Sequence, residues 1–187
     1  RRDGRAGAQF APFWWRSGRW CAVRFTTAGE PLTLRSLALE ESRYPVGGDD
    51  TFTCDDARVA GIRKLALRGL QMCMHETYVD CPYYEQQMYP GDTRVQMLVN
   101  HVISADPRLT FRAIDLFDYS RRDSGLIGMN YPTWGTQDSV TYSLIWPMML
   151  RDCLLWRRCD PAWLRAKALG LRCLISGVSC YENPDGL

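Results

Sequence analysis

The sequence predicts an α+β fold that is mostly α, with a strand-like beginning followed by a helical remainder. Apolar and polar side chains nearly alternate in residues 10–45, which is the period of a half-buried strand. From residue 53 onward, apolar residues recur every three or four positions, which is the period of an amphipathic helix. Short and long connections alternate between the helical segments, so we expect helical hairpins of the kind that build toroids and solenoids.

Two strands joined by a tight turn are predicted near the start of the chain. Aromatic and β-branched residues dominate 20–27 and 31–34, on either side of Ala28-Gly29-Glu30. The apolar phase slips by one position between Leu34 and Leu37, which indicates a bulge in the second strand. An isolated hairpin is marginal in water, so we expect these strands to need a partner sheet from outside this chain.

The first two helices are predicted on either side of an irregular segment. A capping box of Thr53 and Asp56 is expected to open a long helix that ends near Glu76. Asp92 is expected to cap the second helix, which carries the apolar residues Val95, Leu98, Val99 and Val102.

Three more helices are predicted in the second half of the chain. Asp106-Pro107 is a typical helix opening, and Asp160-Pro161 repeats it before a helix that runs to about residue 180. Another helix is expected from about residue 139 to 158, with Trp146 in its core face. The preceding residues 123–136 are rich in glycine, proline and aromatic side chains and are predicted to form a long functional loop.

Composition argues against several kinds of partner. Among 187 residues the net charge is only +2 and the arginines are scattered, so a nucleic-acid surface is not expected. No run of about 18 apolar residues predicts a membrane span. The eight cysteines show neither a C-x-x-C pair nor zinc-ligand spacing, so we expect no metal or cofactor, and reduced thiols in a reducing compartment such as the cytoplasm.

One segment has the composition of a catalytic site. Three carboxylates lie among tyrosines, prolines and a glycine in a stretch too irregular for a plain helix or strand: Asp80, Tyr83, Tyr84, Glu85, Tyr89 and Asp92. A carboxyl group held against aromatic rings loses solvation of its charged form and its pKa rises, whereas a carboxylate in a wetter place stays ionised. This pairing is what acid/base cleavage of a glycosidic bond requires.

The alternative interpretation of these carboxylates is structural. Asp92 could be only a helix N-cap, Asp80 could cap a turn, and Glu85 could be a surface residue, since aspartate favours caps for local hydrogen-bonding reasons. Outside the segment, Trp134 is the best aromatic candidate for a sugar-binding pocket. His75 is expected to cap backbone carbonyls at a helix end, and His101 to be a packing residue.

Two stretches of the sequence, Met74-His75-Glu76-Thr77-Tyr78-Val79-Asp80-Cys81-Pro82-Tyr83-Tyr84-Glu85-Gln86 and Gly91-Asp92-Thr93-Arg94, resemble the signature of the bacterial α-L-rhamnosidase family. The resemblance implies a six-hairpin (α/α)6 barrel in which Glu85 is the general acid. It implies that Asp80 and Asp92 bind sugar hydroxyls or belong to the network of the acid. Many members have Glu-Arg and then a tryptophan here, so Tyr89 would take over sugar stacking.

The same resemblance implies a division of the chain and a reaction. Residues 1–48 would be the C-terminal strands of a β-sandwich, and residues 49–187 the N-terminal part of an incomplete barrel. The reaction would be inverting hydrolysis of terminal α-L-rhamnosyl residues from a glycan or glycoside. The catalytic base would lie beyond Leu187, so the fragment is expected to be inactive without the remainder of its barrel.

Two other functional classes stay open from the sequence. A non-hydrolytic carbohydrate-binding or structural relative of the same fold would keep the sugar site without cleaving, and Gln86-Gln87 is the departure that favours it. A helical protein-interaction scaffold would show no response to sugar.

Overall fold

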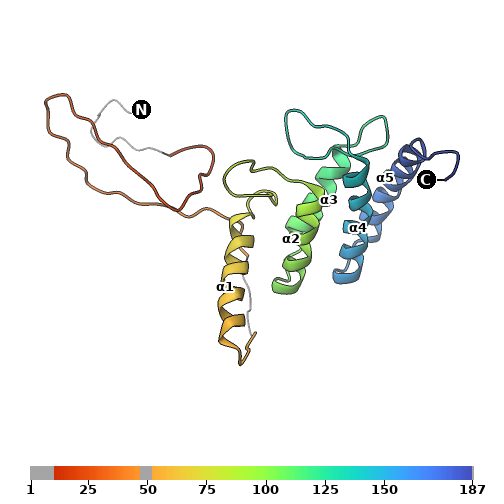
Figure 1. Ribbon diagram of the computed structural model, residues 1–187, viewed down its shortest axis with the longest axis horizontal. Coiled ribbons are helices and arrows are strands. Elements are labelled where there is room, and N and C mark those ends of the chain that lie inside the picture. The colour runs from red at the N-terminus through yellow and green to blue at the C-terminus, as the bar shows by residue number, and fades with distance from the viewer. Residues whose placement is uncertain (1–10, 47–51, 187) are drawn as a thin grey trace. The chain divides into compact units, whose positions relative to one another are not determined.

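The computed structural model describes residues 11–46 and 52–186, and the chain divides into two units between Ser42 and Arg43. The predicted domain boundary between residues 48 and 49 lies outside the described residues. All helices of the described part belong to the second unit (Figure 1): α1 (Ala57–Met72), α2 (Pro90–Ile103), α3 (Arg108–Tyr119), α4 (Val140–Trp156) and α5 (Pro161–Ser179). The prediction of a mostly helical chain is confirmed.

The predicted hairpin is not confirmed, because residues 11–46 contain no strand. Large apolar side chains of this stretch are exposed, among them Trp20, Phe25 and Leu39. An alternating strand becomes stable when one face is buried against a second layer. The described part of the chain offers no strand that could pair with it, so the alternating pattern has no packed structure here.

Three helices begin at a capping side chain, and the starts of α4 and α5 are where the sequence predicts them. Asp56 is the N-cap of α1, and its carboxylate accepts the Arg58 N–H at 2.9 Å. Ser139 caps α4 by accepting the Tyr142 N–H, and the carboxylate of Asp160 caps α5. These side chains satisfy N–H groups that a helix start leaves without partners.

Three predicted helix boundaries are wrong. The expected capping box of Thr53 and Asp56 does not open α1, because Asp56 is itself the N-cap and the helix begins at Ala57. α2 begins at Pro90 with Tyr89 as its N-cap, so Asp92 is not the cap but lies in the first turn. Proline suits the first helical position because its φ is fixed and it has no N–H to satisfy. α1 ends at Met72 rather than near Glu76, because the chain turns back and the Val79 N–H bonds to the Cys73 carbonyl at 2.9 Å.

Helices α2 to α5 pack side by side (Figure 1). α2 contacts α3 and α4, and α4 contacts α3 and α5. The loops before α2 and α4 are hydrogen-bonded, with the Tyr131 N–H donating to the Met88 carbonyl at 3.1 Å. α2 and α4 therefore begin at the same end of the unit and run parallel.

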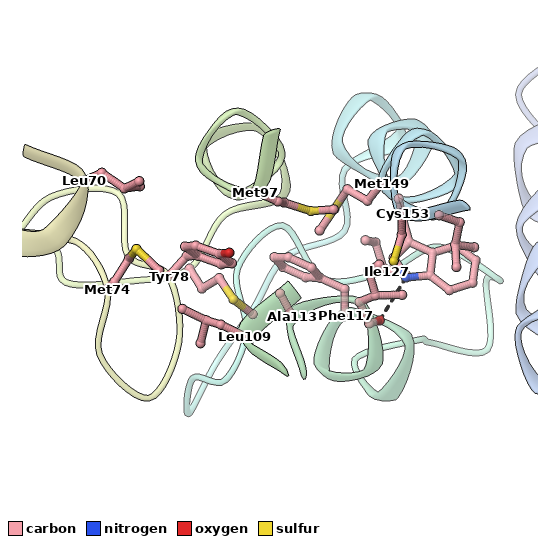
Figure 2. Packing of buried hydrophobic residues seen from close by; sticks show 14 of the residues in the cluster. Leu70, Met74, Tyr78, Met97, Leu109, Ala113, Phe117, Ile127, Met149 and Cys153 are labelled. Carbon is pink, nitrogen blue, oxygen red and sulfur yellow. Dashed lines mark hydrogen bonds between the residues drawn. The ribbon is translucent and has the colours of Figure 1, made fainter. Parts of the chain in front are cut away.

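The core lies between α2, α3 and α4 (Figure 2). Met97, Phe117 and Met149, one from each helix, are fully buried. The indole N–H of Trp146 donates to the Ile114 carbonyl at 3.0 Å, which confirms the predicted core role of this tryptophan. Burial of each such side chain contributes about 1.5 to 3 kcal/mol.

The loops at the helix starts belong to the same core. Tyr78 is fully buried, and its hydroxyl bonds to Asn100 at 3.0 Å and Thr110 at 3.3 Å. Met88, Leu126 and Ile127 are buried as well. Loop residues that pack into the core hold their exposed neighbours in fixed positions.

The valine-rich side of α2 does not face this core. Val95, Val99 and Val102 are exposed, while Thr93, Met97 and Asn100 are buried. The apolar period therefore predicted the helix but not the face that packs against the described helices.

Candidate active site

Two loops meet at the end of the unit where α2 and α4 begin. We call residues 73–89, between α1 and α2, the first loop, and residues 120–139, between α3 and α4, the second loop. Besides the backbone bond between Tyr131 and Met88, the Asn130 side-chain amide donates to the carbonyl oxygen of the Gln87 side chain. The two loops thus form one surface, and this surface carries the carboxylates predicted from the sequence.

Glu85 lies at the end of a turn in the first loop. Its backbone N–H donates to the Cys81 sulfur at 3.3 Å, and the Tyr89 hydroxyl donates to its Oε2 atom at 2.6 Å. The bond to Glu85 raises the pKa of Tyr89 to about 12, because a deprotonated tyrosine would lose this bond and repel the carboxylate. Tyr89 therefore fixes one oxygen of the predicted acid.

The aromatic enclosure expected around Glu85 is not formed by the first loop. Glu85, Tyr83 and Tyr84 are all exposed. The two tyrosine rings pack edge to face on each other, with centroids 4.9 Å apart. Described residues therefore do not supply the desolvation that the sequence pattern suggested for this carboxyl group.

Asp80 closes the segment that carries Glu85. Its Oδ1 atom accepts the Gln87 N–H at 2.9 Å, and its own N–H donates to the Gln87 carbonyl at 2.8 Å. Gln86 lies between with a φ of 54°, in the left-handed region, and its side chain donates to the Pro82 carbonyl at 3.0 Å. Half-buried Asp80 therefore holds together the turn that carries Glu85.

The remaining predicted site residues lie at or near the same end. Asp92 is exposed in the first turn of α2, where unpaired N–H groups favour a negative charge. Trp134 is fully exposed on the second loop. The structure places both on the solvent-facing surface, and their contact with a sugar stays a prediction.

His75 behaves as a structural residue. Its Nε2 atom lies 3.1 Å from the carbonyl oxygen of Met72, the last residue of α1, which confirms the predicted capping role. Burial lowers the pKa of His75, so the ring is neutral at physiological pH.

The sequence did not predict that Cys81 bonds to Glu85 or that Asn130 bonds to Gln87. Asn130 follows Glu85 by many residues and has no periodic pattern that would connect the two. A fold that brings the loops together is needed to find such a pair. Cys81 was recognised only as part of the signature, not as an acceptor for the Glu85 N–H.

The part of the chain that the structure describes has neither a candidate metal site nor a membrane-spanning helix. No group of three or more histidine, cysteine, aspartate or glutamate side chains there could hold a metal ion. None of the helices in residues 11–46 and 52–186 is both long and apolar enough to span a membrane. All eight cysteines are free thiols.

Two solved structures share this arrangement of helical hairpins. A GH78 family rhamnosidase of Bacillus sp. GL1 superposes with a TM-score of 0.71 over 78% of this chain and 15% of that protein, at 23% identity. A rhamnosidase from Klebsiella oxytoca with rhamnose bound gives a TM-score of 0.62 over 69% of this chain and 26% of that protein, at 29% identity. The chain thus spans about a quarter or less of either relative.

The family follows from a second comparison. The model of the bacterial alpha-L-rhamnosidase six-hairpin glycosidase domain matches residues 49–159, which contain both loops and α1 to α4. The chain belongs to this family, and the resemblance seen in the sequence is confirmed. No curated protein matches the chain.

Proposed function

We propose that this chain is part of a bacterial α-L-rhamnosidase that removes terminal α-L-rhamnosyl residues by inverting acid/base hydrolysis, with Glu85 as the general acid. The observation that carries the proposal is the 2.6 Å hydrogen bond from Tyr89 to Glu85, in a loop within the matched family domain. The rhamnose bound in the Klebsiella oxytoca relative supports a rhamnose-containing substrate.

In the proposed reaction, Glu85 gives its proton to the glycosidic oxygen as the bond from that oxygen to the anomeric carbon breaks. Tyr89 occupies Oε2, so Oε1 is the oxygen that carries the transferred proton. A base outside these residues takes a proton from water, whose oxygen attacks the anomeric carbon from the opposite face. The two carboxyl groups of an inverting pair stand roughly 6.5 to 9.5 Å apart.

Substrate contacts are assigned to the exposed residues of the same surface. Asp92 is proposed to accept hydrogen bonds from rhamnose hydroxyls, and the exposed ring of Trp134 to stack on the sugar. Asp80 is proposed to act through Gln87 and Glu85 rather than on the sugar, because one of its carboxylate oxygens already holds the loop.

The proposed domain division follows the same family layout. Residues 1–48 are assigned to the last strands of a β-sandwich and residues 49–187 to the first part of an (α/α)6 barrel. The exposed valines 95, 99 and 102 of α2 support this, since contiguous exposed apolar surface marks an interface. The remainder of the barrel is proposed to cover them, and the fragment alone to be inactive.

The test compares Glu85→Gln with Glu182→Gln in the full-length protein, on an alkyl α-L-rhamnoside. Glutamine keeps the shape of the side chain but cannot donate the proton, so we expect kcat to fall about 10²- to 10⁴-fold. Glu182 is exposed in the turn after α5 and is the matched control, with an unchanged rate. Full activity of Glu85→Gln would refute the assignment of the acid.

A second candidate is a non-hydrolytic carbohydrate-binding relative, favoured by the exposure of Glu85. It predicts that the full-length protein binds rhamnose in titration calorimetry but does not hydrolyse alkyl or aryl α-L-rhamnosides. Turnover by the wild-type protein would exclude it.

A further inference from the structure

We propose that Asn130 and Gln87 form an inter-loop latch that positions Glu85, so that Asn130 of the second loop is a positioning residue for the general acid. The inference rests on the proposed function of Glu85. It adds a residue from a loop to which the sequence assigned only a sugar-stacking aromatic.

The first step is the place of Gln87 in the chain. Gln87 lies between Glu85 and Tyr89, the two residues that share the 2.6 Å hydrogen bond. Its backbone is held by Asp80 through two hydrogen bonds, and its side-chain oxygen accepts the Asn130 amide. Any movement of Gln87 therefore changes the geometry between the acid and its tyrosine.

The second step is that the second loop holds two consecutive residues of the first loop. Asn130 binds the side chain of Gln87, and the next residue, Tyr131, binds the backbone carbonyl of Met88 at 3.1 Å. Met88 is buried, whereas Glu85 is exposed. Cross-loop contacts therefore supply the orientation that burial does not give to Glu85.

The third step is that the second loop is itself braced. Arg122 Nε lies 2.7 Å from Asp138 Oδ1, and the Ser124 hydroxyl donates to Asp138 Oδ2 at 2.9 Å. The Met129 N–H donates to the Gln137 carbonyl at 2.8 Å. This hydrogen bond joins the two backbone segments on either side of residues 130–136. These contacts hold the second loop, and with it Asn130, in one position.

A general acid works only within hydrogen-bond reach of the leaving oxygen. A misplacement of about 1 Å can cost on the order of 10² in rate. Loss of the latch therefore acts on kcat, while the groups that bind the sugar stay in place.

The experiment uses Asn130→Ala, Gln87→Ala, their double variant and Asn130→Asp in the full-length protein, with exposed Asn183→Ala as control. On an alkyl α-L-rhamnoside we expect each alanine variant to lower kcat about 10- to 100-fold, with KM changed less than about twofold. The double variant should be no slower than either single variant, because both remove one interaction. Asn130→Asp should recover activity, since the Gln87 amide can rotate and donate to the carboxylate.

Unchanged kcat in Asn130→Ala, or independent losses that multiply in the double variant, would overturn the latch. Deuterium exchange of residues 83–89 separates this outcome from a failure of the proposed function. The latch predicts faster exchange in Asn130→Ala and not in Asn183→Ala, even in a protein without rhamnosidase activity. If exchange is faster in Asn130→Ala but Glu85→Gln is fully active, the latch stands and the role of Glu85 is refuted. If exchange is unchanged in Asn130→Ala, the latch itself is refuted.

Discussion

The two ends of the parallel helices α2 and α4 use their polar side chains in opposite ways. At the end with the two loops, Glu85 and Asp92 are exposed. At the other end, Asp106 accepts hydrogen bonds from Tyr44 at 2.8 Å and Arg108 at 2.9 Å, and His101 accepts one from Arg157 at 2.9 Å. Charged groups that bind one another stabilise the fold, whereas exposed carboxylates are available to a substrate.

A groove at the second end illustrates the difference. It is lined by Pro45, residues 101–106 and Arg157. Arg157 donates to the His101 ring and to the backbone carbonyls of His101 and Ser104, and Asp106 accepts from Tyr44 and Arg108. The groove lies where the end of α2 and the following loop meet the C-cap residue of α4, and its hydrogen bonds join these elements.

The largest effect that would sharpen the comparison is expected from Arg157→Ala. This change removes the hydrogen bonds to His101 and Ser104. It leaves the Nδ1 atom of the buried His101 ring without a donor, beside an Nε2 atom that already has no partner, so we expect about 3 kcal/mol of destabilisation. Urea unfolding measures the loss, and the rate per folded molecule should be unchanged. A loss of activity in the folded protein would break the distinction between the two ends.

The next effect concerns pH. Burial and the nearby Arg157 charge lower the pKa of His101 to about 4, against an ordinary value of about 6.5, while Asp152 opposes the shift. Between these values the unfolded chain binds a proton that the folded chain does not, so stability falls as the pH falls from 6.5 to 4. We expect about 2 to 3 kcal/mol over this window.

Unfolding of the wild type and of His101→Gln as a function of pH tests this expectation. The variant has no titrating ring at this position and should lose the slope between pH 6.5 and 4. Asp106 also loses stabilisation on acidification, because hydrogen bonds from Arg108 hold its pKa below the usual range, but that loss falls at lower pH. An identical slope in wild type and variant would contradict the assignment to His101.

The smallest effect on stability is expected at the loop end. Glu85→Gln should change the free energy of unfolding by less than about 0.5 kcal/mol, because Glu85 is exposed. The same variant should return the pKa of Tyr89 from about 12 toward 10, since the carboxylate that raises it is gone. Ultraviolet titration of the tyrosines measures the shift, and an unchanged Tyr89 would mean that the hydrogen bond does not form.

The sequence predicted those parts of the fold that depend on neighbouring residues. The helix starts at Ser139 and Asp160 depend on local hydrogen bonds, and the core role of Trp146 follows from its apolar neighbours. Asp56 was expected to pair with Thr53 in a capping box, and it is instead the N-cap itself. The start of α2 was misplaced because Pro90 and Asp92 both open helices, and only the observed structure decides between them.

Features that depend on distant residues could not be predicted. The alternating pattern of residues 11–46 describes a strand face, but a strand also needs a partner strand, and the described part of the chain contains none. For the site, the sequence placed Asp80, Glu85 and Tyr89 in one irregular segment, and the structure has them in the loop between α1 and α2. It gave no sign of Asn130, whose contact with Gln87 exists only because two loops meet.

The central claim, that Glu85 donates the proton to the departing oxygen, is tested most directly by varying the leaving group in Glu85→Gln. A nitrophenolate leaves readily without a proton, whereas an alkoxide requires one in the transition state. The account predicts a loss of about 10² or more in kcat/KM on an alkyl α-L-rhamnoside and less than about tenfold on the nitrophenyl α-L-rhamnoside. Equal losses on the two substrates would contradict it.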